Sequence, residues 1–387
     1  MTASAKLKRT PLYDRHVALG ARVVEFGGWE MPVQYSGIVD EHNAVRNAAG
    51  LFDISHMGEV EVKGRDALAF LQHIATQDVA AIREGQSNYA LLCRPDGGIV
   101  DDIFIYHLPD GYMVVVNASN IEKDFAWMLD NLHGFDVDLT NISDRASMLA
   151  LQGPLAEAML AKATDPSTHS TSSGQASSGQ GIDVAGVPFH GVTTGMLLGD
   201  IPALIARTGY TGEDGFELFI DDDKVEQLWD GLLALGKDDG LKPCGLGARD
   251  SLRFEACLAL YGHEIADDIN PYEAKLGWVV KLDKGDFIGR ATLQQIKRAG
   301  VQRKLAGFEV TGRGIARGGY EIRSLAGEPI GEVTTGMPSP TLGKNLGLGY
   351  VPTALAAEGS EFDVIVRDRP VRASVVKTPF YRPRYKK

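Results

Sequence analysis

The sequence has 387 residues, of which 44% are hydrophobic and 23% are charged, a composition typical of a globular protein with a sizeable core. Its formal net charge of −12 argues against a general nucleic-acid or anionic-membrane surface, because both need clustered positive charge. Cys93, Cys244 and Cys257 are too few and too irregularly spaced for a disulfide framework or a zinc site. We therefore expect reduced thiols and no metal. Because no apolar leader and no long apolar run is present, we expect a cytoplasmic chain without a membrane span.

The first half of the chain alternates helical and strand patterns. A helix over 37–49 is expected to be capped by Ser36 and to stop at Gly50. Strand, turn and strand follow to residue 64. The next predicted elements are a helix at 66–75, a three-strand meander at 87–119 and a helix at 120–132 with Asn120 as its cap.

The second half changes character near residue 285. Residues 163–181 are rich in Ser, Gly and Gln, cannot bury a face, and are expected to form a mobile surface insertion. Predicted strands over 189–220 precede helices at 224–236, 246–262 and 286–300. Short β-branched runs separated by glycines then continue to residue 378 and predict a small β-barrel. The pattern favours an α+β region over 1–284, with two interleaved domains, and a barrel domain over 285–387.

Two adjacent carboxylates lie inside the predicted strand "GGIVDDIFIY". Successive side chains of a strand point to opposite faces, so we expect one of Asp101 and Asp102 to face solvent and the other to face inward. The inward acid is either a structurally paired group or a carboxylate held near a substrate amine, as proton acceptor or counter-charge. From the residues alone both interpretations stay open.

Three further stretches offer candidate chemistry. In "ARTGYTGEDGFELFI", Glu217 is either part of a glycine-rich hairpin or an acceptor for two parallel N–H groups of a planar ligand. In "PCGLGARDSLRFEA", Arg249 either pairs along a helix face or clamps a carboxylate. His56 in "DISHMGEV" is most simply a structural histidine. The motifs of zinc proteases, serine hydrolases and kinases are missing from the sequence.

Taken together, these stretches resemble a known family. The segments "RTPLYDRHVALGARVVEFGGWEMPVQY", "AGLFDISHMGEV", "GGIVDDI", "RTGYTGEDGFEL", "PCGLGARDSLRFEA" and "SPTLGKNLGLGYV" occur in the order found in the aminomethyltransferase, or T-protein, family of the glycine cleavage system. The likeness runs from about Arg9 to Tyr381. It implies a three-domain, cloverleaf-like architecture with a central tetrahydrofolate site and a small C-terminal β-barrel.

The resemblance also implies an activity. A family member takes an aminomethyl group from the lipoyl arm of the H protein. It then forms 5,10-methylenetetrahydrofolate and releases ammonia and the dihydrolipoyl carrier. By the matching motif positions, Asp102 is the expected catalytic carboxylate. The residues expected to bind the folate, which acts as co-substrate, are Met57, Tyr89, Asn117, Tyr210, Glu217, Arg249, Trp278 and Tyr385.

Relatives with other activities give two alternatives. An oxidative demethylase that uses folate as acceptor is expected to carry a flavin domain with GxGxxG, whereas this sequence opens near "RTPLYDRH". An iron–sulfur assembly factor is expected to carry a "KGCYxGQ"-like signature, whereas the comparable stretch reads "LALYGHEIADD". The transferase is therefore the favoured function. We expect a transient encounter with the H protein, no nucleic acid, no membrane and a monomer.

Overall fold

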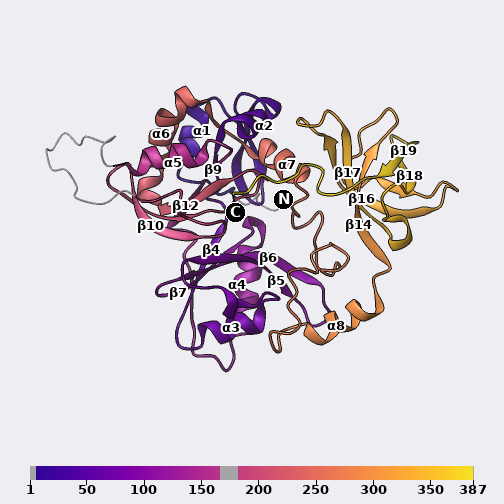
Figure 1. The fold of residues 1–387 in the computed structure, drawn as a ribbon, viewed down its shortest axis with the longest axis horizontal. Helices are drawn as coiled ribbons and strands as arrows, with labels where there is room; N and C mark the ends of the chain where they lie inside the picture. The colour runs from indigo at the N-terminus through magenta and orange to yellow at the C-terminus, as the bar shows by residue number, and fades with distance from the viewer. Residues whose placement is uncertain (1–5, 166–181, 387) are drawn as a thin grey trace.

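The computed structural model describes residues 6–165 and 182–386. Two facing β-sheets, each covered by helices on its outer face, are joined to a β-barrel (Figure 1). The predicted insertion at 163–181 lies outside the described residues from residue 166 onward. The N-terminal lobe begins with helix α1 and a two-stranded hairpin, followed by helix α2. Their bounds are α1 Tyr13–Ala18, β1 Arg22–Phe26, β2 Trp29–Gln34 and α2 Ile38–Asn47.

A five-stranded antiparallel sheet in the order β5-β6-β7-β4-β8 forms one layer, and its outer face is covered by helices α3 and α4. Apolar side chains alternate along its strands, so one face packs on Phe70 and Leu71 of α3 and on Met128 of α4. The bounds are β4 Gly58–Lys63, α3 Ala67–Ile74, β5 Gln86–Cys93, β6 Ile99–Leu108, β7 Gly111–Val116, α4 Ile121–Asp130 and β8 Asp138–Asn141. The predicted meander is thus present.

A six-stranded sheet in the order β10-β11-β12-β9-β3-β13 forms the facing layer. Helices α5 and α6 cover its outer face, where Trp229 is fully buried. The inner faces of the two sheets meet through a shared cluster that includes Phe52, Met148 and Tyr106. The bounds are β3 Ala49–Asp53, β9 Ala146–Gln152, α5 Ala156–Thr164, β10 Val192–Leu197, β11 Ile201–Ala206, β12 Gly215–Asp221, α6 Val225–Gly236 and β13 Leu241–Pro243.

Helices α7 (Leu246–Glu255) and α8 (Arg290–Ala299) lead to a closed barrel with the strand order β14-β17-β16-β15-β18-β19. This confirms the predicted small barrel and the α+β class. A buried cluster around Phe308 and Phe362 fills its interior. The bounds are β14 Arg303–Val310, β15 Glu321–Arg323, β16 Pro329–Pro338, β17 Asn345–Pro352, β18 Glu361–Val366 and β19 Arg369–Val375.

Two predicted helix boundaries were wrong. The N-cap of α2 is Gly37, not Ser36, and the helix ends at Asn47. Gly50 is not a stop but the second residue of β3, where a Cβ atom would lie 2.5 Å from Val45 and 2.6 Å from Cys244. Its small size is therefore needed for close packing rather than for a turn.

The helix predicted over 246–262 also ends early, at Glu255. Its chain reverses at Cys257, whose φ of 54° lies in the left-handed region. In the described part of the chain, no helix combines the length and apolar character needed to cross a membrane.

Candidate functional site

A cavity of about 930 Å³ opens between the two sheets, the start of α7 and the loop before α8. It has the size of a pocket for a drug-sized or cofactor-sized ligand. The structure brings every site residue predicted from the sequence to its wall. These residues are Met57, Tyr89, Asp102, Asn117, Tyr210, Glu217, Arg249, Trp278 and Tyr385.

Asp102 faces the cavity from the centre of β6. Asn117, just after β7, donates from Nδ2 to Oδ1 of Asp102 at 2.8 Å, and Tyr89 of β5 is a second hydrogen-bond partner. Burial, followed by the charge of Asp101, raises the pKa of Asp102 to about 7. The carboxyl is therefore balanced between its neutral and ionised forms near neutral pH.

Asp101 does not face solvent, so the expectation of one solvated acid was wrong. Its side chain is fully buried on the side of β6 where α4 packs. Nδ2 of Asn117 donates to Oδ1 of Asp101 at 2.9 Å, and the backbone N–H of Asn117 donates to Oδ2 at 3.3 Å. Burial, followed by the neighbouring Asp101, raises the pKa of Asp124 of α4 to about 10, so Asp124 is neutral at pH 7. Its buried carboxyl oxygens have no hydrogen-bond partner among the described residues.

Glu217 reaches the cavity from β12, on the sheet opposite Asp102. Its Oε2 accepts the hydroxyl of Thr208 at 2.5 Å and that of Tyr106 at 3.3 Å. Burial raises its pKa, while the hydrogen bond from Thr208 and the charge of Arg249 oppose the rise. The two donors hold the carboxylate in one orientation, as recognition of a planar N–H edge requires.

Arg249 lies in the first turn of α7 and stacks on the Tyr210 ring, with its guanidinium carbon 4.7 Å from the ring centroid. Within the described residues, no carboxylate forms an ion pair with it and no acceptor receives its N–H groups. Burial lowers its pKa, which Glu217 partly offsets. A half-buried guanidinium with free donors is suited to a ligand's carbonyl or carboxylate oxygens.

The "GLG" stretch before Arg249 is needed for close packing. A Cβ atom at Gly245 would lie 2.5 Å from the Val33 backbone, and one at Gly247 would lie 2.6 Å from Ile38. The glycines thus bring the start of α7 against β2. Of the ion pairs expected along the face of this helix, the one between Arg253 and Asp250 is present, with a distance of 2.8 Å. Glu255 forms its ion pair with Arg46 of α2 instead.

Aromatic pairs border the cavity at two places. Trp278 is 59% exposed and stacks on Tyr89, with centroids 5.9 Å apart and planes at 22°. Tyr385 stacks on Phe189 at 4.7 Å and 24°. The tail that carries Tyr385 is bound to the N-terminal lobe, because Lys386 pairs with Glu157 at 2.7 Å. Lys387 lies outside the described residues.

Sequence reasoning missed several wall residues. Phe189 and His190 lie in a turn just before β10, where the sequence predicted a strand, and Phe26 comes from the tip of the β1–β2 hairpin. His56 also lines the cavity, and its Nδ1 has no hydrogen-bond partner among the described residues. It is therefore not the fully satisfied structural histidine that we expected. Burial lowers its pKa to about 4, so the ring is neutral at pH 7.

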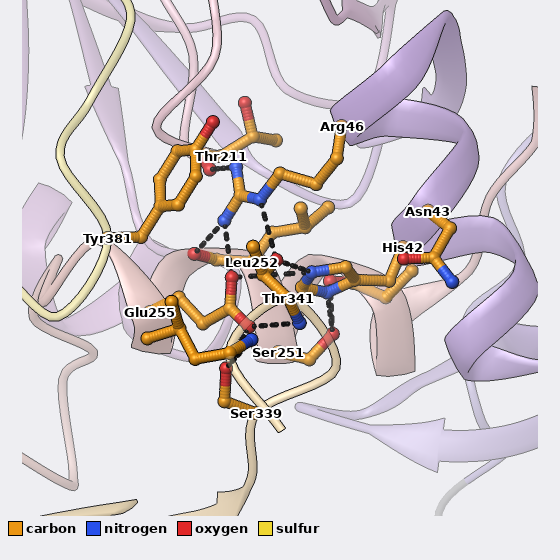
Figure 2. Close-up of polar contacts among 12 residues, drawn as sticks. His42, Asn43, Arg46, Thr211, Ser251, Leu252, Glu255, Ser339, Thr341 and Tyr381 are labelled. Carbon is orange, nitrogen blue, oxygen red and sulfur yellow. Dashed lines mark hydrogen bonds and ion pairs between the residues drawn. The ribbon is translucent and has the colours of Figure 1, made fainter. Parts of the chain in front are cut away.

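A polar network behind the cavity joins α2, α7, the barrel and the tail (Figure 2). The guanidinium of Arg46 lies 2.9 Å from Oε2 of Glu255 and 3.0 Å from Oε1 of Glu213. Glu255 Oε1 accepts the hydroxyl of Ser339 at 2.5 Å, and Tyr381 hydrogen-bonds Glu213 at 2.5 Å. Every charge in this network is paired, which indicates a structural role.

Comparison with known proteins agrees with this arrangement. The family model described as the GCVT N-terminal domain matches residues 12–284, and the glycine cleavage T-protein C-terminal barrel domain matches residues 303–382. The chain is 56% identical to the aminomethyltransferase of Herpetosiphon aurantiacus, covering 98% of this chain and 100% of the relative. It is 50% identical to that of Alkaliphilus oremlandii, covering 99% and 100%.

A solved structure gives the same result in three dimensions. The glycine cleavage system aminomethyltransferase T from Bartonella henselae superposes with a TM-score of 0.87 at 34% identity. The match covers 98% of this chain and 100% of that one, barrel included. By sequence along nearly its whole length and by fold, the chain belongs to the glycine cleavage T-protein, or aminomethyltransferase, family.

Proposed function

We propose that this chain is the tetrahydrofolate-dependent aminomethyltransferase of glycine cleavage. It moves the aminomethyl carbon from the lipoyl arm of the H protein to tetrahydrofolate, giving 5,10-methylenetetrahydrofolate, ammonia and dihydrolipoyl carrier. Family membership over nearly the whole chain supports the reaction, and members of this family use tetrahydrofolate as a substrate. The observation that carries the proposal is Asp102, a carboxyl of pKa about 7 in the wall of the large cavity.

The cavity has two polar ends that suit the two ends of a reduced pterin. Glu217 accepts hydrogen bonds where the exocyclic amine and ring N–H present two parallel donors. Arg249, without a partner among the described side chains, donates to carbonyl oxygen. Asp102, on the opposite sheet, then lies toward the reacting nitrogens N5 and N10. Met57 and Tyr210 provide apolar and aromatic wall between these ends.

The chemistry needs a fixed negative charge at one moment. N5 takes the aminomethyl carbon and the carrier sulfur leaves with the bonding electrons. The amine takes up the proton that N5 carried and departs as ammonia, which leaves the carbon cationic. N10 then attacks this carbon and loses its proton, which balances the thiolate released on the carrier. The Asp102 carboxylate stabilises that cation without reorganisation and is placed to accept the N10 proton. Its raised pKa makes it a better proton acceptor than an ordinary aspartate.

Ammonia release from aminomethylated H protein tests the reaction directly. We expect release to be strongly stimulated by tetrahydrofolate, with 5,10-methylenetetrahydrofolate formed in equal amount. Tight folate binding without stimulated release would contradict the proposal, because it would indicate a folate-binding relative with another activity.

The variant Asp102→Asn tests the role of the carboxylate. Loss of a preorganised charge of this kind costs roughly 3–4 kcal/mol in the transition state, so turnover should fall by about 10² or more. Folate affinity should stay within about tenfold, because the amide keeps the shape of the wall. Asp130→Asn, at the exposed end of α4, is the matched control and should retain activity. Equal losses in binding and turnover would indicate a structural acid instead.

We further propose that the H protein binds transiently to a monomeric chain. A lipoyl arm that serves several enzymes in turn requires a carrier that dissociates readily. Analytical ultracentrifugation with and without the carrier tests both statements, and a stable stoichiometric complex or a dimer would contradict them.

A further inference from the structure

Asp101 is a fully buried carboxylate that the proposed reaction does not use. It is the neighbour of Asp102 on β6, but it lies on the other face of the strand, where α4 packs. Burying a carboxylate is costly unless hydrogen-bond donors satisfy its oxygens. The contacts of Asp101 therefore indicate what it does for the site.

Asn117 links the two acids across the strand. It directly follows β7, which pairs with β6 in the sheet. Its side-chain nitrogen Nδ2 donates to Oδ1 of Asp101 at 2.9 Å and to Oδ1 of Asp102 at 2.8 Å. The two N–H groups of one amide are thus used by two carboxylates. A flipped amide would place its oxygen against both of them, so these contacts allow one orientation only.

Asp101 provides the contacts that hold this amide in place. Its Oδ1 accepts one side-chain N–H of Asn117, and its Oδ2 accepts the backbone N–H of the same residue at 3.3 Å. The second side-chain N–H is then directed at Asp102. The orientation of the Asp102 carboxylate therefore depends on an acid that lies on the opposite face of β6.

The groups on the α4 side set the electrostatic surroundings of Asp101. The carboxyl oxygens of Asp124 are buried and have no hydrogen-bond partner among the described residues, and Asp124 is neutral at pH 7 because its pKa is about 10. The ammonium group of Lys123 lies 3.8 Å from Oδ1 of Asp124 and 4.0 Å from the ring centroid of Tyr261. Burial raises the pKa of Tyr261, so this phenol is neutral as well.

The groups on the cavity side of Asp102 are also uncharged. Tyr89 of β5 hydrogen-bonds to it, and Tyr210 lines the same cavity. Burial raises the pKa of both phenols, which therefore keep their protons at neutral pH. The charge that acts most on Asp102 is that of Asp101, and it makes Asp102 bind a proton more strongly.

We infer that Asp101 is a positioning residue of the aminomethyl transfer, because it fixes the Asn117 amide that orients Asp102 and strengthens Asp102 as the acceptor of the N10 proton. The inference rests on the proposed function. Asp101 acts from behind the strand and through its neighbours, whereas Asp102 faces the cavity.

The proton step involves three bonds. The lone pair of N10 forms the bond to the cationic carbon, the N10–H bond breaks, and the proton passes to an oxygen of Asp102. Asp102 becomes neutral and then returns the proton to solvent, where it balances the thiolate of the carrier. The charge of Asp101 makes the transfer from N10 to Asp102 more favourable.

The variant Asp101→Asn removes the charge and keeps the geometry, since the new amide oxygen can still accept from Asn117. The readout is single-turnover formation of 5,10-methylenetetrahydrofolate against pH. In the wild type this rate should rise with pH around a midpoint near 7, as Asp102 ionises. In Asp101→Asn the midpoint should be lower by about one pH unit or more. At pH 8 the rate should be about three- to tenfold lower, because the weaker base accepts the proton less readily.

The matched comparison is Asp124→Asn, the same acid-to-amide change in the same cluster at a group that is already neutral. Its midpoint should equal that of the wild type. An unshifted midpoint in Asp101→Asn, or equal shifts in both variants, would overturn the inference. A rate that falls by one factor at every pH would also overturn it, because it would assign Asp101 a purely structural role.

The variant Asp101→Glu tests the other half of the inference, since it keeps the charge and displaces the acceptor. Its midpoint should stay near 7, while the rate at pH 8 should fall by about three- to tenfold because Asn117 is no longer held. A wild-type rate in this variant would show that Asp101 does not orient Asp102 through the amide.

Infrared titration of the Asp102 carboxyl needs no turnover. Spectra of the wild type and of Asp101→Asn, each compared with the chain that also carries Asp102→Asn, follow the protonated carboxyl against pH. The protonation midpoint should be lower in Asp101→Asn, and an equal midpoint would overturn the inference even in an active enzyme. Failure of the proposed function would appear instead in the wild-type chain, as missing ammonia release.

Discussion

At the scale of single residues, Asp102 is a carboxyl group in surroundings that favour its neutral form. Burial and the neighbouring Asp101 both oppose ionisation, and hydrogen bonds from Asn117 and Tyr89 only partly compensate. Asn117 donates to both Asp101 and Asp102, and Asp101 lies close enough to Asp124 to raise its pKa, so three acids share one small region. An acid kept in this state is useful for catalysis and costly for stability.

This cost predicts how stability depends on pH. The folded-state pKa of Asp102, about 7, lies above the ordinary value of 3.8, so the folded chain binds more protons than the unfolded chain between these values. Stability therefore falls as pH rises from about 4 to 7. Asp102→Asn removes this pH dependence. The difference in free energy of unfolding between the variant and the wild type should therefore be more favourable to the variant at pH 8 than at pH 4.5, by on the order of 1–4 kcal/mol.

Denaturant unfolding of both chains at the two pH values measures this gain. The exposed Asp130→Asn variant should show no pH-dependent gain. If Asp102→Asn behaves like that control, the carboxyl titrates normally and its raised pKa is refuted.

How far single residues were predictable depended on where their partners lie. Glu217 and Arg249, which were expected to bind folate because each stands in a distinctive local motif, both line the cavity. Asp101 was misplaced because alternation along β6 says which face a side chain takes, but not that α4 covers that face. Phe189 carries no local signal at all, and its role depends on Tyr385, which is almost 200 residues away in the chain.

At the scale of elements, the meander and the barrel followed from turn chemistry and β-branched runs, whereas boundaries set by tertiary packing did not. Strand β15 has only three residues, too few for alternation to be recognised. Helix α7 ends at Glu255 because the chain must reverse at Cys257, and Gly50 serves the contact between α2 and β3. In each case, contacts with a neighbouring element fix where the helix or strand begins or ends, and the local sequence does not.

The tail beyond β19 is an element without regular structure that still forms part of the site. Tyr385→Ala removes an aromatic stack worth about 0.5–1.5 kcal/mol, so the KM for tetrahydrofolate should rise by about two- to tenfold. Tyr385→Phe keeps the ring and should behave like the wild type in the same steady-state assay. If both variants raise KM equally, the hydroxyl and not the stacked ring is what the substrate needs.

At the scale of the whole molecule, the network around Arg46 joins α2, α7 and the barrel (Figure 2). It adds polar contacts to a buried cluster that β5, α7 and the barrel strands β14 and β17 already share. Arg46 belongs to α2 and Glu255 to α7, while Ser339 and Thr341 come from the barrel. Burial opposes ionisation of Glu255, yet the hydrogen bond from His42 and those from the barrel lower its pKa to about 2. The lobes are thus connected by charges that are stable only when all partners are present.

Arg46→Met should therefore destabilise the molecule strongly. It leaves Glu213 and Glu255 buried without their cation, at a cost of about 3–5 kcal/mol. We expect a lower urea midpoint, which intrinsic fluorescence and circular dichroism would both detect. Lys242→Ala breaks the exposed pair with Asp40 and should change stability by at most about 1 kcal/mol. A similar effect of the two variants would show that the network does not join the lobes.

The stack of Tyr385 on Phe189 also has a consequence for folding during synthesis. The cavity wall combines Val24 and Phe26 with Tyr385, which is synthesised more than 350 residues later. While the chain is being synthesised, the sheets and their helices have what they need to fold, but the cavity lacks one side. A chain whose synthesis has not yet passed Tyr385 therefore lacks one side of the cavity, and the site can be completed only afterwards.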